Sequence, residues 1–256
     1  MLFLGIPYEP FLFGYKVNVH LILEYTAFFV AFRYYLFLRK RSFDSISSNN
    51  RLSIIIGAIF GALFLSRVMA FFENPMLHWN QEWIAILNNK TIMGGLFGGL
   101  LGVELAKKII GEQKSSGDLF TLPIILGIII GRLGCFVAGI NEFTYGKITD
   151  FFLGMDLGDG FDRHPIALYE IFFLTLLFLL IRNLQKQSYP LKSGDYFKLF
   201  MVCYFGFRFY IEFLKPNSFE IFGLSSIQIL CLLCLLYYYK FIQQGLSYAR
   251  EKLHLL

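Results

Sequence analysis

Seven long apolar stretches, separated by short charged segments, constrain this chain more than any other feature. A helix needs roughly 20 mostly apolar residues to cross the hydrocarbon layer of a bilayer. Here 56% of the residues are hydrophobic and only 16% are charged, whereas a soluble domain usually carries about 25% charged residues. We therefore predict an all-α membrane protein, a bundle of about seven transmembrane helices. The stretches are 19–38, 52–72, 91–106, 119–139, 165–181, 199–214 and 225–242, and the third and sixth are short.

The positions of the Lys and Arg residues predict the orientation of these helices. Of the 23, 14 lie in the segments that follow the first, third, fifth and seventh stretches, and 5 lie in the segments on the opposite side. Because loops rich in Lys and Arg stay in the cytoplasm, we expect the N-terminus outside and the C-terminus in the cytoplasm. The expected location is the bacterial inner (plasma) membrane, as a multi-pass protein. Nucleic acid is not an expected partner, since the basic residues form no face with interleaved aromatic side chains.

The chain reads as a single transmembrane domain over residues 1–256, with two long outer loops. The loop 73–90 carries Trp79 and Trp83, which suit a membrane interface. The loop 140–164 is the longest on that side and is rich in glycine. Loops of this length in compact proteins tend to be functional.

The four cysteines lie inside apolar segments, at positions 135, 203, 231 and 234. Cys231 and Cys234 have the C-x-x-C spacing, but neither a second pair nor a nearby histidine completes a zinc site. We therefore expect packing thiols and no metal.

The third stretch carries glycines at every fourth position, in two parallel rows. One row holds Gly94, Gly98 and Gly102, and the other holds Gly95 and Gly99. Small residues at this spacing allow two helix backbones to approach closely in lipid. The glycines are therefore expected to serve either tight helix packing or direct approach of the backbone to a lipid ligand.

Charged residues inside the apolar stretches need partners or a purpose, because each costs on the order of 3 kcal/mol to insert. Arg132 lies deep in the fourth stretch, and Tyr204, Arg208 and Glu212 share one helical face in the sixth. Arg208 and Glu212 could form a structural ion pair. Alternatively, Arg132 and Arg208 could bind a phosphate, which a guanidinium holds bidentately.

A second polar group opens the fifth stretch, where Arg163, His164 and Pro165 precede Tyr169 and Glu170. Proline at a helix start is ordinary. His164 could bond backbone groups there, or it could belong to a functional site. In the first stretch His20 and Glu24 are four residues apart, which favours a structural contact.

Three motifs together carry a resemblance that covers nearly the whole chain. They are Gly131-Arg-Leu-Gly-Cys-Phe136 with Gly139 and Tyr145-Gly146, then Arg163-His-Pro-Ile-Ala-Leu-Tyr-Glu170, then Tyr204-x-x-x-Arg208-x-x-x-Glu212. With the Gly-Gly-Leu-x-Gly-Gly run of the third stretch, the chain resembles the prolipoprotein diacylglyceryl transferase family.

The resemblance implies a transferase that moves a diacylglyceryl group from phosphatidylglycerol to the lipobox cysteine thiol of a prolipoprotein signal peptide. The product is a thioether, and no cofactor is implied. Arg132 and Arg208 would hold the lipid phosphate, Tyr204 and Glu212 would orient Arg208, and His164 is a further catalytic candidate. The expected substrate-binding residues are Arg132, Arg208, Gly94, Gly95, Gly139, Gly146, Tyr169 and Glu170.

Three positions depart from the family pattern. Met93 stands where the family commonly has His, Cys135 where it usually has Asn, and Lys215 where Arg is frequent. A thioether cannot accept a proton at neutral pH, so Met93 cannot serve as a general base. The candidate general bases in its place are His164 and Glu170, followed by His20. The alternative functions are a phospholipid-using transferase with another acceptor, or a non-catalytic lipid-binding membrane protein.

Overall fold

The computed structural model describes residues 5–42, 44, 46–73, 89–187, 192–216 and 219–253, leaving aside the side chains of 248–253. The chain forms two compact units. Unit 1 comprises Met1–Phe43, Ser116–Phe197 and Phe213–Pro216, and unit 2 comprises Asp44–Ser115, Lys198–Glu212 and Asn217–Leu256. The predicted loop 73–90, with Trp79 and Trp83, lies for the most part outside the described residues. The single domain 1–256 stays a prediction.

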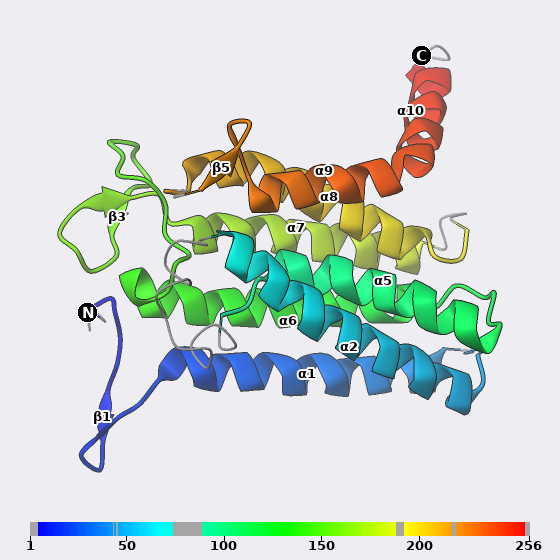
Figure 1. The fold of residues 1–256 in the computed structure, drawn as a ribbon, viewed down its shortest axis with the longest axis horizontal. Helices are drawn as coiled ribbons and strands as arrows, with labels where there is room; N and C mark the ends of the chain where they lie inside the picture. The colour runs from blue at the N-terminus through cyan, green and yellow to red at the C-terminus, as the bar shows by residue number, and fades with distance from the viewer. Residues whose placement is uncertain are drawn as a thin grey trace. The chain divides into compact units, whose positions relative to one another are not determined.

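An α-helix forms at each of the seven predicted stretches (Figure 1). The helices are α1 (Val19–Arg41), α2 (Ser48–Glu73), α5 (Ile92–Ile110), α6 (Asp118–Ala138), α7 (Ile166–Lys186), α8 (Asp195–Ile211), α9 (Ser226–Tyr237) and α10 (Tyr239–Leu253). The described residues also contain two short 3-10 helices, η1 (Gly139–Asn141) and η2 (Glu212–Leu214). Three antiparallel hairpins pair β1 (Phe11–Leu12) with β2 (Tyr15–Lys16), β3 (Met155–Asp156) with β4 (Asp162–Arg163), and β5 (Glu220–Ile221) with β6 (Leu224–Ser225).

Among the described residues, four helices are long and apolar enough to cross a membrane, namely α1, α2, α6 and α7. The bent pair α9–α10 adds a fifth span if it is counted as one. The all-α membrane class is therefore confirmed, with four to five candidate spans.

The predicted stretch 225–242 forms two helices, and the chain bends by 62° between α9 and α10. The N–H of Tyr238 donates to the carbonyls of Cys234 and Leu236, which closes the end of α9. Beyond this point the purely apolar run gives way to the polar residues Lys240, Gln243 and Gln244. An amphipathic segment of this kind lies more favourably along a bilayer surface than across it.

In unit 1, α6 packs between α1 and α7. Glycines bring α6 close to α1, since a Cβ on Gly134 would lie 3.1 Å from the His20 ring and one on Gly127 would lie 3.2 Å from Ala31 Cβ. The order of these contacts makes the two helices antiparallel. This places the last turns of α6 beside the first turn of α1, where the polar residues of unit 1 gather.

In unit 2, α2 and α5 form an antiparallel pair in backbone contact. A Cβ on Gly98 would lie 2.3 Å from the Gly61 carbonyl oxygen, and one on Gly102 would lie 2.1 Å from that of Gly57. No side chain fits at these distances. The prediction of tight packing by the row Gly94, Gly98 and Gly102 is therefore confirmed.

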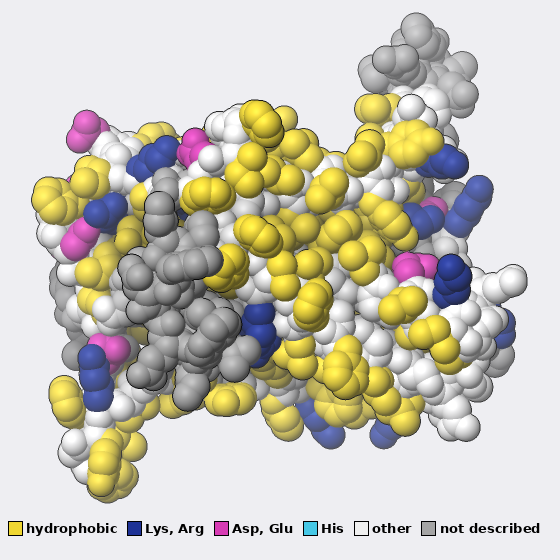
Figure 2. All heavy atoms as spheres, in the orientation of Figure 1, with side chains coloured by type: hydrophobic (Ala, Val, Ile, Leu, Met, Phe, Trp, Pro, Cys, Tyr) yellow, Lys and Arg dark blue, Asp and Glu magenta, His cyan; other side chains and the backbone are white. Residues whose placement is uncertain are grey.

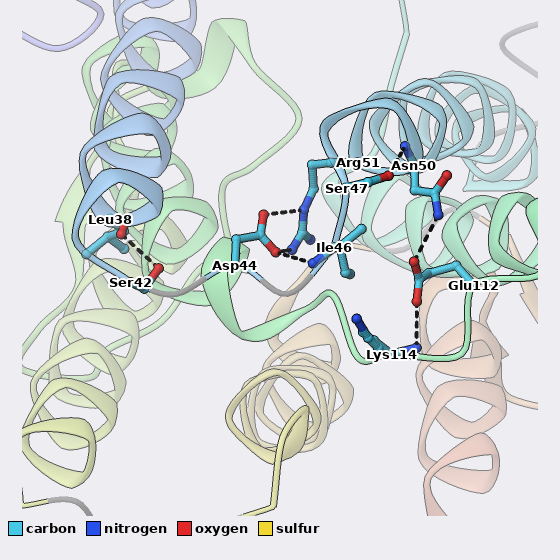
Figure 3. Close-up of polar contacts among 9 residues, drawn as sticks. All are labelled: Leu38, Ser42, Asp44, Ile46, Ser47, Asn50, Arg51, Glu112 and Lys114. Carbon is cyan, nitrogen blue, oxygen red and sulfur yellow. Dashed lines mark hydrogen bonds and ion pairs between the residues drawn. The ribbon is translucent and has the colours of Figure 1, made fainter.

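A polar network links the first turn of α2 to the segment before it and to the segment after α5 (Figure 3). The carboxylate of Asp44 accepts from Arg51 Nε at 3.0 Å and also pairs with the second guanidinium nitrogen. Asn50 Nδ2 donates to Glu112 Oε2 at 3.0 Å, which links the start of α2 to the segment after α5. The bond from Asn50 lowers the pKa of Glu112. Charged and amide groups at a helix end suit the water-facing side of a membrane protein.

Large apolar side chains of α2 are exposed, among them Ile56, Phe60 and Phe64. Figure 2 shows hydrophobic side chains spread over much of this face of the molecule. A soluble protein rarely exposes such a contiguous apolar surface. The surface of α2 is therefore suited to contact with lipid.

Candidate active site

Arg132 of α6 forms an ion pair with Glu170 of α7 in unit 1. The Nε atom lies 2.8 Å from Glu170 Oε2, and the two side chains are 8% and 0% exposed. A buried ion pair is stable only when both partners are present, because removing either one leaves an uncompensated charge. Two motif residues on different helices are thus brought into direct contact.

Cys135 lies one turn after Arg132 and touches two basic groups. Arg132 NH1 is 3.8 Å from the sulfur, and His20 Nε2 of α1 is 3.7 Å from it. The other ring nitrogen of His20, Nδ1, is 3.0 Å from Glu142 Oε1, just after η1. His20 therefore pairs with a residue far along the chain, and Cys135 contacts basic side chains of two helices.

A small cavity adjoins this cluster. It encloses about 10 Å³, roughly the space of one water molecule. Its walls include Cys135, Gly139, Tyr145, Pro165 and Ala167. All of these residues belong to unit 1, so the cavity lies where two of the sequence motifs meet.

Gly139 and Gly146 allow close backbone approach at this place. Gly139 has a positive φ of 57°, and a Cβ on it would lie 2.3 Å from the Leu157 carbonyl oxygen. A Cβ on Gly146 would lie 2.5 Å from His164 Cβ. Both glycines are thus required by the local fold, and their binding of substrate stays a prediction.

His164 lies beside the cavity, at the foot of the loop 140–164. Its Nδ1 is 3.2 Å from the hydroxyl of Tyr169, and burial lowers the pKa of His164. The backbone N–H of His164 donates to Lys147, and the N–H of Gly146 donates to His164. The sequence left open whether the His164 side chain bonds backbone groups or serves the site. Those bonds are made by the main chain of His164, whereas its ring contacts Tyr169, and its role in the site stays a prediction.

The loop 140–164 is an ordered element built on charged contacts. Arg163 forms an ion pair with Asp159 at 2.6 Å, donates to the Gly146 carbonyl at 3.2 Å and stacks 5.1 Å over the Tyr145 ring. Pairing with Asp159 raises the pKa of Arg163 and lowers that of Asp159. The arginine of the Arg-His-Pro motif therefore stabilises the loop.

Asp156 shapes the turn of the β3–β4 hairpin in the same loop. Its Oδ1 accepts from the backbone N–H groups of Gly158, Asp159 and Gly160, at 2.8, 3.1 and 3.0 Å. These bonds lower the pKa of Asp156, because they favour the charged carboxylate.

The third motif lies in unit 2, on α8 and η2. Arg208 NH2 donates to Glu212 Oε2 at 2.8 Å, and both residues are buried. Tyr204, also buried, stacks on Phe200 with ring centroids 5.7 Å apart. The structural ion pair considered from the sequence is therefore present.

The two glycines expected to bind substrate in unit 2 differ in their surroundings. A Cβ on Gly94 would lie 2.6 Å from the Leu65 carbonyl oxygen, whereas one on Gly95 would meet only Ser66 Cβ, at 3.8 Å. Gly94 is thus part of the helix contact. Binding of substrate by Gly94 and Gly95 stays a prediction.

Two residues of the unit 1 cluster were not singled out as site residues from the sequence. No sequence motif pointed to Glu142, and Cys135 was expected to be a packing thiol. The available signal was the replacement of the family's Asn by Cys135, next to a motif arginine. Lys215, buried, lies 5.1 Å over the Phe143 ring in the same unit.

Comparison with known proteins gives a consistent result. The profile of the prolipoprotein diacylglyceryl transferase family matches residues 11–242. A protein of Wolbachia sp. subsp. Brugia malayi named phosphatidylglycerol–prolipoprotein diacylglyceryl transferase is 30% identical over 194 residues, covering 71% of this chain and 69% of that protein. A protein of the same name from Campylobacter hominis is 28% identical over 247 residues, covering 88% and 85%. One from Ehrlichia ruminantium is 38% identical over 112 residues, covering 42% of each chain.

Proposed function

The chain belongs to the prolipoprotein diacylglyceryl transferase family, and we propose that it transfers a diacylglyceryl group from phosphatidylglycerol to the lipobox cysteine thiol of a prolipoprotein. The acceptor sulfur forms a thioether bond to the glycerol carbon, and the bond from that carbon to the phosphate oxygen breaks. Glycerol phosphate leaves with the electron pair. The reaction uses no cofactor.

The observation that carries this proposal is the buried pair of Arg132 and Glu170 between two apolar helices. Charged residues at such a depth are costly and are usually retained for a function. A guanidinium has five N–H donors, so an arginine that pairs with a carboxylate through one edge can also donate to a phosphate.

The proposed roles follow from this chemistry. Arg132 and Arg208 bind the phosphate of phosphatidylglycerol and stabilise the negative charge that develops as glycerol phosphate departs. Glu212 and Tyr204 orient Arg208. His164, Tyr169, Glu170 and the glycines at 94, 95, 139 and 146 complete the proposed site.

We further propose a single domain of seven spans in the bacterial inner membrane, with the N-terminus outside and the C-terminus in the cytoplasm. The seven helices and the biased distribution of Lys and Arg support this topology. The acceptor signal peptide then enters from the outer side, near the loop 140–164. Fusion of a reporter that is active only in the cytoplasm to the C-terminus tests the orientation, and a silent reporter with normal expression would contradict it.

The activity is tested with the purified full chain, phosphatidylglycerol vesicles and a synthetic lipobox peptide. Mass spectrometry of the peptide should find the added diacylglyceryl group, and released glycerol phosphate should match it in amount. A product on a different thiol or on another nucleophile would identify a transferase with another acceptor. Retained lipid without any product would indicate a lipid-binding protein that is not an enzyme.

Two conservative variants test the phosphate-binding role. Arg132→Lys and Arg208→Lys each keep the positive charge and remove the planar fork, so turnover should fall by about 100-fold or more. Arg33→Lys is the matched control, because Arg33 is an exposed arginine of α1 and should tolerate the change. Wild-type turnover in both buried variants would remove the phosphate-binding proposal.

A further inference from the structure

Cys135 stands between two basic groups in the structure. The thiol is 8% exposed, and its sulfur lies 3.7 Å from the His20 ring and 3.8 Å from the Arg132 guanidinium. A thiol beside an imidazolium or a guanidinium tends to lose its proton, because the neighbouring positive charge stabilises the thiolate. The cluster thus has the composition of an activated thiol.

Glu142 fixes the orientation of the His20 ring. A carboxylate only accepts hydrogen bonds, so the contact of 3.0 Å requires His20 Nδ1 to carry a proton and donate it. The other nitrogen, Nε2, then faces the sulfur. A thiol, an imidazole and a carboxylate in this order form the arrangement by which proteins activate a thiol.

A nucleophilic role for Cys135 conflicts with the proposed reaction. Attack by its sulfur on phosphatidylglycerol would form a thioether, which has no good leaving group, and the diacylglyceryl group would stay on the protein. A thiolate at this position is instead suited to accept a proton. Met93, buried in unit 2, has no basic atom for that task.

We propose that Cys135 is the proton acceptor for the thiol of the incoming lipobox cysteine, and that His20 and Glu142 return its proton to water. This inference rests on the proposed function and names a base for it. The proton of the acceptor thiol moves to the Cys135 sulfur, while the acceptor sulfur bonds to the glycerol carbon and glycerol phosphate departs. No atom changes oxidation state.

The route for the proton runs outward along the same contacts. While Cys135 is a thiolate, His20 is an imidazolium. After the proton of the acceptor reaches the sulfur, His20 loses one proton to water by way of Glu142, and the neutral ring, with its remaining proton at Nδ1, takes the proton of the sulfur at Nε2. Cys135 is then a thiolate again, and one proton has passed to water. Exposure increases along this path, since the side chains of His20 and Glu142 are 19% and 39% exposed. The charged groups around the sulfur are His20 from α1, Arg132 from α6, Glu142 after η1 and, through Arg132, Glu170 from α7.

The protonation of Cys135 is measured without any turnover, by the infrared S–H stretching band of the full chain in lipid. The difference between wild type and Cys135→Ser isolates the contribution of this thiol from those of the other three cysteines. We expect no Cys135 S–H band at neutral pH in the wild type, and its appearance in His20→Gln. A Cys135 S–H band in the wild type, or no change in His20→Gln, would overturn the proposal.

Turnover gives the second readout. Cys135→Ser is nearly isosteric but cannot form an anion at neutral pH, so the turnover number should fall by about 100-fold or more, with the KM for phosphatidylglycerol unchanged. Cys203→Ser, a partly exposed thiol of α8, should keep wild-type turnover. Full turnover in Cys135→Ser would refute the role of Cys135 as the proton acceptor, while the proposed function would stand. Absence of turnover in the wild type would refute the function instead, and the infrared result would still report the state of the thiol.

Glu142 is a positioning residue in this scheme, and its test differs accordingly. Glu142→Ala should produce a partial Cys135 S–H band, which the wild type lacks, and should raise the pH at which turnover is half-maximal. Glu142→Asp keeps the carboxylate and should show the pH profile of the wild type. An unchanged pH profile in Glu142→Ala would show that the carboxylate has no part in the relay.

Discussion

The two units of this protein hold their helices together by different means. In unit 1, α6 and α7 are joined by the buried ion pair of Arg132 and Glu170, and α6 meets α1 at two glycines and through the contact of Cys135 with His20. In unit 2, α2 and α5 are joined by glycines, backbone against backbone. The buried ion pair of unit 2, Arg208 with Glu212, lies within one helical segment.

The difference between the ion pair of unit 1 and the glycine contacts of unit 2 helps to decide which polar groups serve function. Glycine contacts supply packing in lipid without any charge. Unit 1 uses charged residues where apolar packing would serve stability equally well. Charge that is not needed to hold helices together is best explained by the chemistry it supports.

The largest effect should come from breaking the ion pair between helices. Glu170→Ala removes the carboxylate that forms the ion pair with buried Arg132, and should lower the free energy of unfolding by about 3–5 kcal/mol. Glu212→Ala should cost less than half as much, because a helix in a membrane persists in the unfolded reference state and Arg208 loses a partner in both states. Reversible denaturation in mixed micelles measures both.

A matched double variant sharpens this comparison. Arg132→Met combined with Glu170→Met should recover most of the stability lost in Glu170→Ala, since both charges of the ion pair are removed together. Equal losses in Glu170→Ala and Glu212→Ala would remove the distinction between the two ion pairs.

A smaller effect is expected from filling the glycine contact of unit 2. In Gly98→Ala the new methyl group would lie 2.3 Å from the Gly61 carbonyl oxygen and 2.5 Å from Leu65 Cβ. The two helices must separate, at a cost of about 1–3 kcal/mol in the free energy of unfolding. Gly95→Ala is the control, because its methyl group meets only Ser66 Cβ at 3.8 Å and should change stability by about 0.5 kcal/mol or less. Similar losses in the two variants would contradict the proposed contact.

The smallest effect concerns the pH dependence of the loop in unit 1. The folded-state pKa of Asp156 lies below its ordinary value, because three backbone N–H groups bond the carboxylate. Its contribution is therefore complete above the ordinary value of about 3.9 and is lost as the pH falls through the folded-state pKa. Hydrogen exchange at 158–160, corrected for its intrinsic pH dependence, should lose protection below about pH 4.

Two variants bracket that measurement. Asp156→Asn should show weak protection at all pH values, and Asp150→Asn, at an exposed position of the same loop, should behave as the wild type. Protection in the wild type that stays constant down to acid pH would contradict the role of the carboxylate.

The sequence predicted the positions of the helices well, because apolar length is a direct physical requirement for crossing a bilayer. It did not predict the bend at Tyr238, where the apolar helix α9 gives way to the more polar helix α10. Hydropathy averaged over a window of residues does not detect a bend of the backbone. The tight contact of Gly98 with Gly61 was predictable from one side only, because the partner row on α2 is short.

The polar pairs divide in the same way. Arg208 with Glu212 followed from helical spacing, since the two residues are four apart. Arg132 with Glu170 and His20 with Glu142 are separated by many residues and depend on which helices become neighbours. Spacing along one helix carries no information on that, so Glu142 was missed and Glu170 was placed in the site only by resemblance.

The close meshing of α2 and α5 also limits how unit 2 can move. A Cβ on Gly57, Gly61, Gly98 or Gly102 would lie within 2.6 Å of an atom of the facing helix, so a rotation that brings a side chain into this contact must separate the two helices. The two helices are therefore expected to move as one rigid body during the reaction. Helix movements that admit or release a lipid are then expected at other positions, such as the bend between α9 and α10.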